Sequence, residues 1–127
     1  MSWLEPVTLA GRHATLVPLA AEHAVGLADA VRDGELWKLW YTTIPSPDAM
    51  ADAVHARLAL QARGAMLPFT VLDAQGRIAG MTTYMNVDAT HRRVEIGATW
   101  YARRVQRTPL NTECKLMLLG HAFDALD

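Results

Sequence analysis

Residues 92–127 decide the fold, and they read RRVEIGATWYARRVQRTPLNTECKLMLLGHAFDALD. The β-branched and aromatic content of residues 92–101 predicts a strand. A basic loop follows at residues 103–107. Thr108 is a good N-cap and Pro109 a good first helical residue, so we expect a long helix over residues 109–126.

The chain ahead of this strand predicts two more strands and two helices. The β-rich stretches 67–72 and 77–87, joined by a turn, form an antiparallel meander with 92–101. Apolar residues at helical spacing predict helices over 20–32 and 47–63. Nearer the N-terminus, Gly11 supplies the turn of a short hairpin.

These elements indicate the fold class. Helices and an antiparallel sheet that are segregated along the chain are typical of an α+β fold. Repeats, low-complexity stretches and linkers are absent from the sequence, so residues 1–127 are expected to form a single domain.

Composition limits the function. The chain has 127 residues, 51% of them hydrophobic, and its 12 Lys+Arg against 13 Asp+Glu give a net charge of −1. Near-zero charge gives no support to binding nucleic acid or an anionic membrane. The single cysteine, Cys114, excludes an intramolecular disulfide, and neither a signal peptide nor a bilayer-spanning run is apparent. We therefore expect a cytoplasmic domain.

No metal site is expected from the sequence. Its histidines lack the spacing of metal ligands, and one cysteine cannot form a cysteine-based zinc cluster. The five histidines of the sequence are His13, His23, His55, His91 and His121. Cys114 lies on an apolar helix face and is interpreted as a core residue rather than a nucleophile.

The last helix is apolar over more than one face. Leu116, Leu119 and Phe123 widen the stripe that Leu110 and Leu118 belong to, so this helix should be covered on several sides. No strand follows it in the sequence to complete a crossover. We expect a C-terminally shortened piece of a longer domain.

The junction between the last strand and the last helix could bind a phosphate. A helix N-terminus presents free N–H groups and the positive end of the helix dipole, and Arg103, Arg104 and Arg107 lie beside it. The alternative is a capped helix with a solvated basic loop.

The strand VEIGATW at 94–100, the basic loop and the helix start TECKL at 112–116 together resemble the GNAT superfamily of acetyltransferases. The likeness is to the branch that acetylates the N-termini of ribosomal proteins. In that branch a Glu-Ile-Gly strand leads through an Arg/Gln-x-x-Gly-x-Gly/Ala loop into a helix that starts Thr-Glu-Ala. The order of the upstream elements is also that of GNAT proteins. The resemblance implies acetyl-coenzyme A as donor and an amine as acceptor.

The resemblance also implies which residues bind the co-substrate. Gln106 takes the Arg/Gln position, while Pro109 and Asn111 replace the two small residues. Proline offers no N–H and cannot adopt a positive φ, so the pyrophosphate would be held by the remaining amides. These belong to Arg107, Thr108, Leu110, Asn111 and Thr112. Arg104 would favour the adenosine-side phosphates, and Thr99, Trp100 and Tyr101 would pair with the pantetheine arm through backbone groups.

Glu95 is the candidate general base. A carboxylate can remove the proton from an ammonium substrate before its nitrogen attacks a thioester. Strict alternation predicts that Glu95, Thr99 and Tyr101 share one face of the strand, opposite Trp100. The alternative is a solvated carboxylate paired with Arg77 or Arg92.

Three functional hypotheses remain open. The first is an N-acetyltransferase that acts on a primary amine, either a protein N-terminus or a small molecule. The second is a non-catalytic or truncated domain of the same fold, and the third is a protein-interaction module. Trp37, Trp40 and Tyr41 are either packing residues or part of the acceptor cleft. If the 127 residues are the whole molecule, the unpaired edge of strand 92–101 predicts a homo-oligomer with little or no acetyl transfer.

Overall fold

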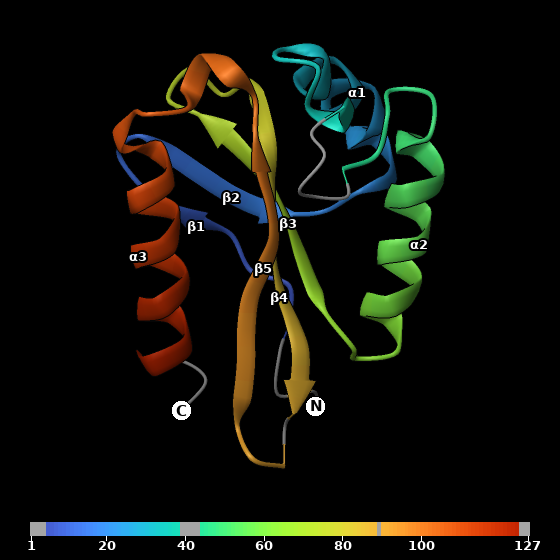
Figure 1. Cartoon of the computed structure of the whole chain (residues 1–127). Helices are drawn as coiled ribbons and strands as arrows, with labels where there is room; N and C mark the ends of the chain where they lie inside the picture. The colour runs from blue at the N-terminus through green and yellow to red at the C-terminus, as the bar shows by residue number, and fades with distance from the viewer. Residues whose placement is uncertain (1–4, 39–43, 89, 125–127) are drawn as a thin grey trace.

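The computed structural model describes residues 5–38, 44–88 and 90–124, and it contains one sheet with helices on both faces (Figure 1). The strands are β1 (Leu9–Ala10), β2 (Ala14–Pro18), β3 (Leu67–Asp73), β4 (Ile78–Asp88) and β5 (Arg93–Tyr101). The α-helices are α1 (Ala24–Arg32), α2 (Met50–Ala62) and α3 (Pro109–Asp124). Short 3₁₀ turns are η1 (Ala21–His23), η2 (Leu36–Lys38) and η3 (Arg103–Val105).

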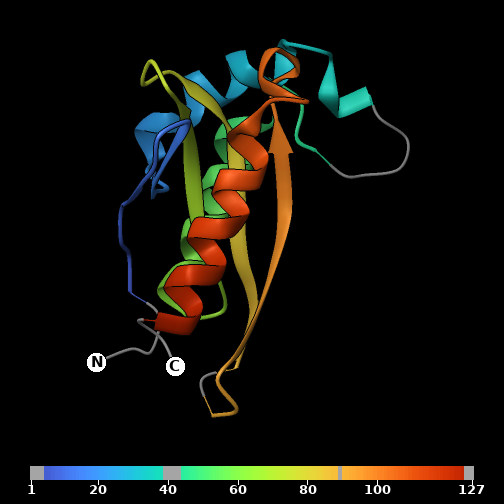
Figure 2. The same ribbon diagram turned by 90° about the vertical axis from the view of Figure 1, so that its left-hand side faces the viewer.

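The sheet has the order β1-β2-β3-β4-β5, and every neighbouring pair is antiparallel. Helix α3 covers one face, and α1 and α2 cover the other, as the two perpendicular views show (Figures 1 and 2). This confirms the predicted α+β fold with an antiparallel central sheet. β5 lies at one end of the strand order, so no other strand of the described residues pairs with its outer edge.

Two helices begin later than the sequence predicts. The segment expected to be one helix over residues 20–32 opens as the 3₁₀ turn η1, because the His23 ring accepts the Ala20 N–H at 3.0 Å and bonds the Thr70 hydroxyl at 2.7 Å. The helix expected from Pro47 begins at Met50 instead. Ser46 Oγ accepts the N–H of Ala49 at 3.3 Å, so the serine caps a preceding turn.

A bulge in β5 overturns the expected division of its faces. Met81 pairs with Trp100 and Thr83 with Gly97, so Thr82 alone faces the two residues Ala98 and Thr99. Ala98 has a φ of 48°. Because one residue is inserted, the alternation reverses beyond it.

The side chains on either side of the bulge show the reversal. Thr99 Oγ1 bonds Thr82 Oγ1 at 2.8 Å, on the α3 face of the sheet. Glu95 lies on the opposite face, where it pairs with Met85. The prediction that Glu95 and Thr99 share a face was therefore wrong, since a bulge leaves no mark in the apolar pattern.

The core joins α3 to the middle of the sheet. The Tyr84 hydroxyl donates to the Leu118 carbonyl, and its ring stacks on His121 with centroids 6.4 Å apart. Burial raises the pKa of Tyr84 to about 12. Away from this contact α3 stays open to solvent, because Leu116, Leu119 and Phe123 are 64%, 46% and 72% exposed.

Candidate co-substrate and acceptor site

At Tyr101 the backbone groups of β5 face the outer edge of the sheet. Ala102 donates its N–H to the Ala79 carbonyl at 2.7 Å, and the Trp100 carbonyl oxygen lies against Gly80. The backbone groups of the two flanking residues therefore point toward β4. The backbone N–H and C=O of Tyr101 point away from it. Of the three residues expected to pair with a pantetheine arm, Tyr101 has outward-facing backbone groups, while the Trp100 carbonyl points to β4.

Gln106 lies beside this edge. Its side-chain Nε2 donates to the Tyr101 carbonyl at 2.9 Å. The Gln106 main chain continues η3, with its N–H bonded to the Arg103 carbonyl at 3.1 Å. The loop thus folds back against the edge strand.

The N-terminus of α3 lies at the end of this loop. Thr108 Oγ1 accepts the Leu110 N–H at 3.3 Å and bonds the Val105 carbonyl, which confirms Thr108 as the cap and Pro109 as the first helical residue. Pro109 has no N–H. The N–H of Asn111 precedes the first intrahelical bond, so the helix does not use it. Asn111 Oδ1 is buried without a hydrogen-bond partner.

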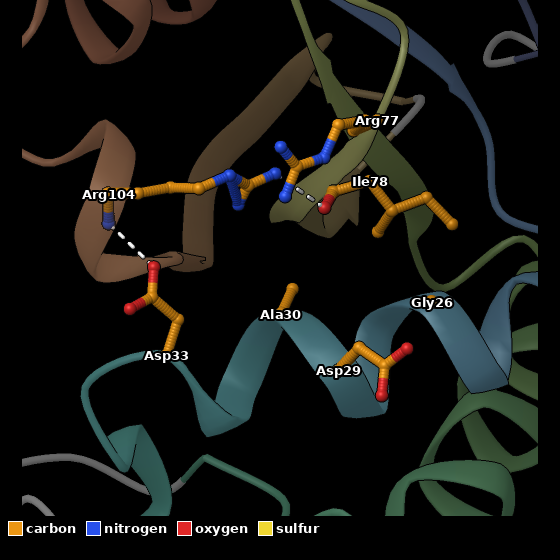
Figure 3. Close-up of a pocket in the computed structure, with 7 residues that line it drawn as sticks. All are labelled: Gly26, Asp29, Ala30, Asp33, Arg77, Ile78 and Arg104. Carbon is orange, nitrogen blue, oxygen red and sulfur yellow. Dashed lines mark hydrogen bonds between the residues drawn. The ribbon is translucent and has the colours of Figure 1, made fainter.

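Arg104 is held by contacts with three elements. Its N–H donates to Asp33 Oδ2 at 2.7 Å, and its guanidinium bonds Asp73 Oδ2 at 3.1 Å and the Ile78 carbonyl at 3.2 Å. The guanidinium lines an open pocket of about 530 Å³ between α1 and the start of β4 (Figure 3). Its side chain is 28% exposed.

A second pocket brings three of the expected binding residues together. It measures about 310 Å³, and Arg104, Thr108 and Leu110 all line it. His13, from the hairpin turn, completes the wall at the N-terminus of α3. Arg107 and Thr112 are exposed near it, and Arg107 has a left-handed backbone with a φ of 62°.

Glu95 is exposed on the α1 and α2 face of β5. Asn86 Nδ2 donates to Glu95 Oε2 at 2.8 Å. Asn86 lies at a second bulge, on β4, and has a φ of 51°. The structure thus pairs Glu95 with an amide rather than with Arg77 or Arg92. The sequence analysis did not identify Asn86, although asparagine tolerates the left-handed region.

Glu113 is a second residue that the sequence analysis left without a role. Its Oε1 accepts the N–H groups of His13 at 2.6 Å and Ala14 at 2.8 Å. A Cβ on Gly11 would stand 2.3 Å from the same oxygen, so a larger residue there would displace the Glu113 carboxylate. The first turn of α3 is therefore tied to the β1–β2 hairpin.

These bonds predict a pH-dependent stability. Desolvation raises the pKa of Glu113, but the bonds from His13, Ala14 and Arg12 outweigh it and hold the pKa below its ordinary value. A glutamate whose pKa is lower in the folded state than in the unfolded state stabilises the fold at pH values above its ordinary pKa of about 4.3. This stabilisation is lost as the pH falls through the pKa of the folded state.

We expect Glu113→Gln to lower the free energy of unfolding by about 1 kcal/mol near neutral pH, since a charged acceptor is replaced by a neutral one at a partly exposed site. Urea titrations from about pH 7 to about pH 3 should show the difference from wild type shrinking. Glu5→Gln, at an exposed site, is the matched control and should give a flat difference. A constant deficit for Glu113→Gln would contradict the prediction.

Cys114 is buried, and burial raises its pKa to about 11. Burial also raises the pKa of the Tyr101 hydroxyl, which has no hydrogen-bond partner. A protonated thiol packed in the core is a poor nucleophile, in agreement with its interpretation as a core residue. Trp37 is half-buried and packs against the core, while Trp40 and Tyr41 lie outside the described residues.

Within residues 5–38, 44–88 and 90–124, no three His, Cys, Asp or Glu side chains gather as a metal ion would require. In the same part of the chain, no helix combines the length and apolarity needed to cross a membrane.

Comparison with known proteins agrees with this geometry. The acetyltransferase (GNAT) domain family matches residues 13–127, so the chain belongs to this family. Its members use acetyl-coenzyme A as the acetyl donor. No curated protein matches the chain.

Several solved structures share the fold. A GCN5-related N-acetyltransferase from Brucella melitensis is 28% identical, with a TM-score of 0.77 over 98% of this chain and 58% of its own. An acetyltransferase from Salmonella typhimurium, which modifies the N-terminal serine of a ribosomal subunit protein, is 15% identical with a TM-score of 0.77, over 91% of this chain and 67% of its own. RimL, solved in complex with coenzyme A, is 16% identical with a TM-score of 0.75, over 91% of this chain and 67% of its own. The chain thus spans between 58% and 67% of the length of these three structures.

Proposed function

We propose that this chain binds acetyl-coenzyme A and supports acetyl transfer to a primary amine, of a protein N-terminus or a small molecule. The observation that carries the proposal is the junction of β5 and α3 in a chain that belongs to the GNAT family. There, outward-facing backbone groups on the β5 edge lie beside a helix N-terminus with an unused N–H. Acetyl-coenzyme A supplies the activated acetyl group.

In this proposal the loop holds the anionic part of the co-substrate. The N–H groups of Arg107, Thr108 and Asn111 are candidates for the pyrophosphate, together with those of Leu110 and Thr112. Leu110 would have to release its bond to Thr108, and Thr112 would have to release the first intrahelical bond of α3. Arg104 and Gln106 lie on two sides of this proposed anion site. Arg104 lines the pocket at the start of α3, and Gln106 lies on the β5 edge.

Glu95 is proposed as the proton acceptor. Its exposed carboxylate lies on the face opposite α3, three residues before Ala98 in β5, and the Asn86 amide orients one of its oxygens. An oriented carboxylate can take the proton of an ammonium group directly or through water.

Calorimetric titration of coenzyme A into the chain tests the proposal. We expect binding, and hydrogen exchange should then slow at the amides of residues 108–112, with the start of α2 as an internal control. Pro109→Gly should bind at least as tightly as wild type, because it restores an N–H and backbone freedom. Absence of binding would overturn the proposed function, and a sharp loss of affinity in Pro109→Gly would show that the phosphate binds elsewhere.

Pro109 supports a second candidate, a non-catalytic domain that retains the fold. A proline at the first helical position removes one N–H from the proposed anion site. This candidate predicts that the chain binds coenzyme A. It also predicts that no free thiol forms when the chain is mixed with acetyl-coenzyme A and an amine.

We also propose that the chain acts in the cytoplasm and self-associates through the outer edge of β5 and the exposed apolar side of α3. An unpaired edge beside exposed Leu116, Leu119 and Phe123 favours association. Sedimentation velocity should show a dimer or larger species at about 100 μM, and replacing Leu116 and Phe123 with lysine should shift it to monomer. Val25→Lys, at another exposed apolar residue, is the control and should not. A monomeric wild type would contradict this expectation.

A further inference from the structure

A pocket of about 340 Å³ lies between the C-terminal half of α3 and the first half of β5, on the face of the sheet opposite Glu95 (Figure 1). Pockets that hold small molecules in proteins measure about 300 to 1,000 Å³, so this one is large enough for a single small ligand. Glu95 and the loop at residues 103–112 do not line it. It is therefore separate from the proposed acetyl-transfer site.

The wall of this pocket is mostly apolar. Its apolar residues come from β4, β5 and α3, and they are Tyr84, Val94, Ile96, Leu119, Ala122 and Phe123. Tyr84 stands directly opposite Ile96 in the β4–β5 ladder. The Tyr84 hydroxyl already donates to the Leu118 carbonyl, so the tyrosine contributes only its ring to the pocket. A ligand must therefore bring a hydrocarbon group.

Two guanidinium groups give the pocket a positive charge. Arg92 and Arg93 complete its lining, both are exposed, and no Asp or Glu of the described residues lines it. Arg93 Nη2 lies 3.7 Å from Asp88 Oδ2, and such an exposed pair contributes little. Arg92 forms no ion pair within the part of the chain that the structure describes. At least one guanidinium is thus available to an anion.

Together these groups select one class of ligand. A guanidinium binds a carboxylate through two parallel N–H···O bonds, and an apolar wall binds a hydrocarbon chain. A cation would be repelled, and a neutral alcohol would leave the guanidinium groups without an anionic partner. The volume lies at the small end of the range for ligand pockets, which suits one short chain rather than the two of a membrane lipid.

We propose that this pocket binds a medium-chain monocarboxylate, with its hydrocarbon chain between β5 and α3 and its carboxylate at Arg92 and Arg93. The site goes beyond the proposed function, since it lies on the other face of β5. Leu119 and Phe123 also belong to the surface proposed for self-association. The carboxylate and a second copy of the chain therefore compete for the same side chains.

Octanoate is the probe for this site, and calorimetry measures its binding. We expect one saturable site. Hexanoate should bind about tenfold more weakly, because two buried methylene groups are lost. 1-Octanol should bind more weakly by about tenfold or more, since its hydroxyl forms weaker hydrogen bonds with a guanidinium than a carboxylate does. Octylammonium should not bind.

Two variants locate the site. Arg92→Gln should lower the octanoate affinity about tenfold and leave that of 1-octanol unchanged. Arg63→Gln, at an exposed arginine that follows α2, is the matched control and should change neither. Ala122→Leu should fill the pocket and abolish the binding of both. Leucine is nearly as good a helix former as alanine, so the circular dichroism and melting temperature of this variant should show that α3 is kept.

The outcomes decide the proposal. Saturable octanoate binding that both variants weaken supports it. Absence of octanoate binding would overturn it, including the case in which sedimentation shows a dimer that octanoate does not dissociate, because a second copy then fills the pocket. Equal binding of octanoate, 1-octanol and octylammonium would also overturn it, because the arginines would then play no part. Unchanged binding in Arg92→Gln and Ala122→Leu would show that octanoate binds elsewhere on the protein.

Discussion

Gly80→Ala is expected to lower the free energy of unfolding by about 3 kcal/mol, and to damage the β5 edge as it does so. A Cβ at this position would stand 2.2 Å from the Trp100 carbonyl oxygen and 3.0 Å from Tyr101 Cα. Both atoms belong to the backbone of the neighbouring strand, so no side-chain rotation can relieve the overlap. The strands must separate where the Tyr101 backbone turns outward.

Urea denaturation measures this effect, and Gly120→Ala is the control. Gly120 lies in the last part of α3, and a Cβ there would meet no atom within 4 Å. Alanine favours a helix by about 1 kcal/mol over glycine, so this variant should be slightly more stable than wild type. Equal stabilities for Gly80→Ala and wild type would show that β4 and β5 are farther apart than described here.

Glu95→Gln is expected to lower kcat about a hundredfold, with little change in coenzyme A affinity. The amide keeps the size of the side chain and can still pair with Asn86, but it cannot accept a proton at neutral pH. Steady-state thiol release, measured across pH with a primary amine, gives both kcat and its acidic limb. An unchanged pH–rate profile in this variant would remove Glu95 from the mechanism.

Asn86→Asp provides a second, independent test of the role of Glu95. Aspartate tolerates the left-handed backbone at this bulge. It would place a second carboxylate against Glu95, and a neighbouring negative charge raises the pKa of a carboxyl group. The acidic limb of the rate profile should therefore move to higher pH. Glu22→Gln, an exposed carboxylate in η1, should leave the profile in place.

Local signals predicted most of the elements, because the residues that produce them are close in sequence. Thr108 and Pro109 mark the start of α3 through the cap they form with their immediate neighbours. The strands at β3, β4 and β5 follow from β-branched and aromatic content, and their boundaries agree with the sequence to within one residue.

The site was less accessible to sequence analysis, because its geometry depends on pairing between strands. The Ala98 bulge is set by the register of β4 against β5, so alternation along β5 alone placed Thr99 on the wrong face. Glu113 finds its partners about 100 residues earlier in the chain, a distance over which no local pattern operates.

The bond between Glu113 and the hairpin also constrains the order of folding. The His13 N–H donates to the carboxylate of a residue that lies 100 positions later in the chain. Contacts of such long sequence separation slow folding, because a large loop must close before they form. On a ribosome, β1, β2 and β3 would emerge before α3, so the hairpin turn would gain its bonds to Glu113 only after the start of α3 has been synthesised.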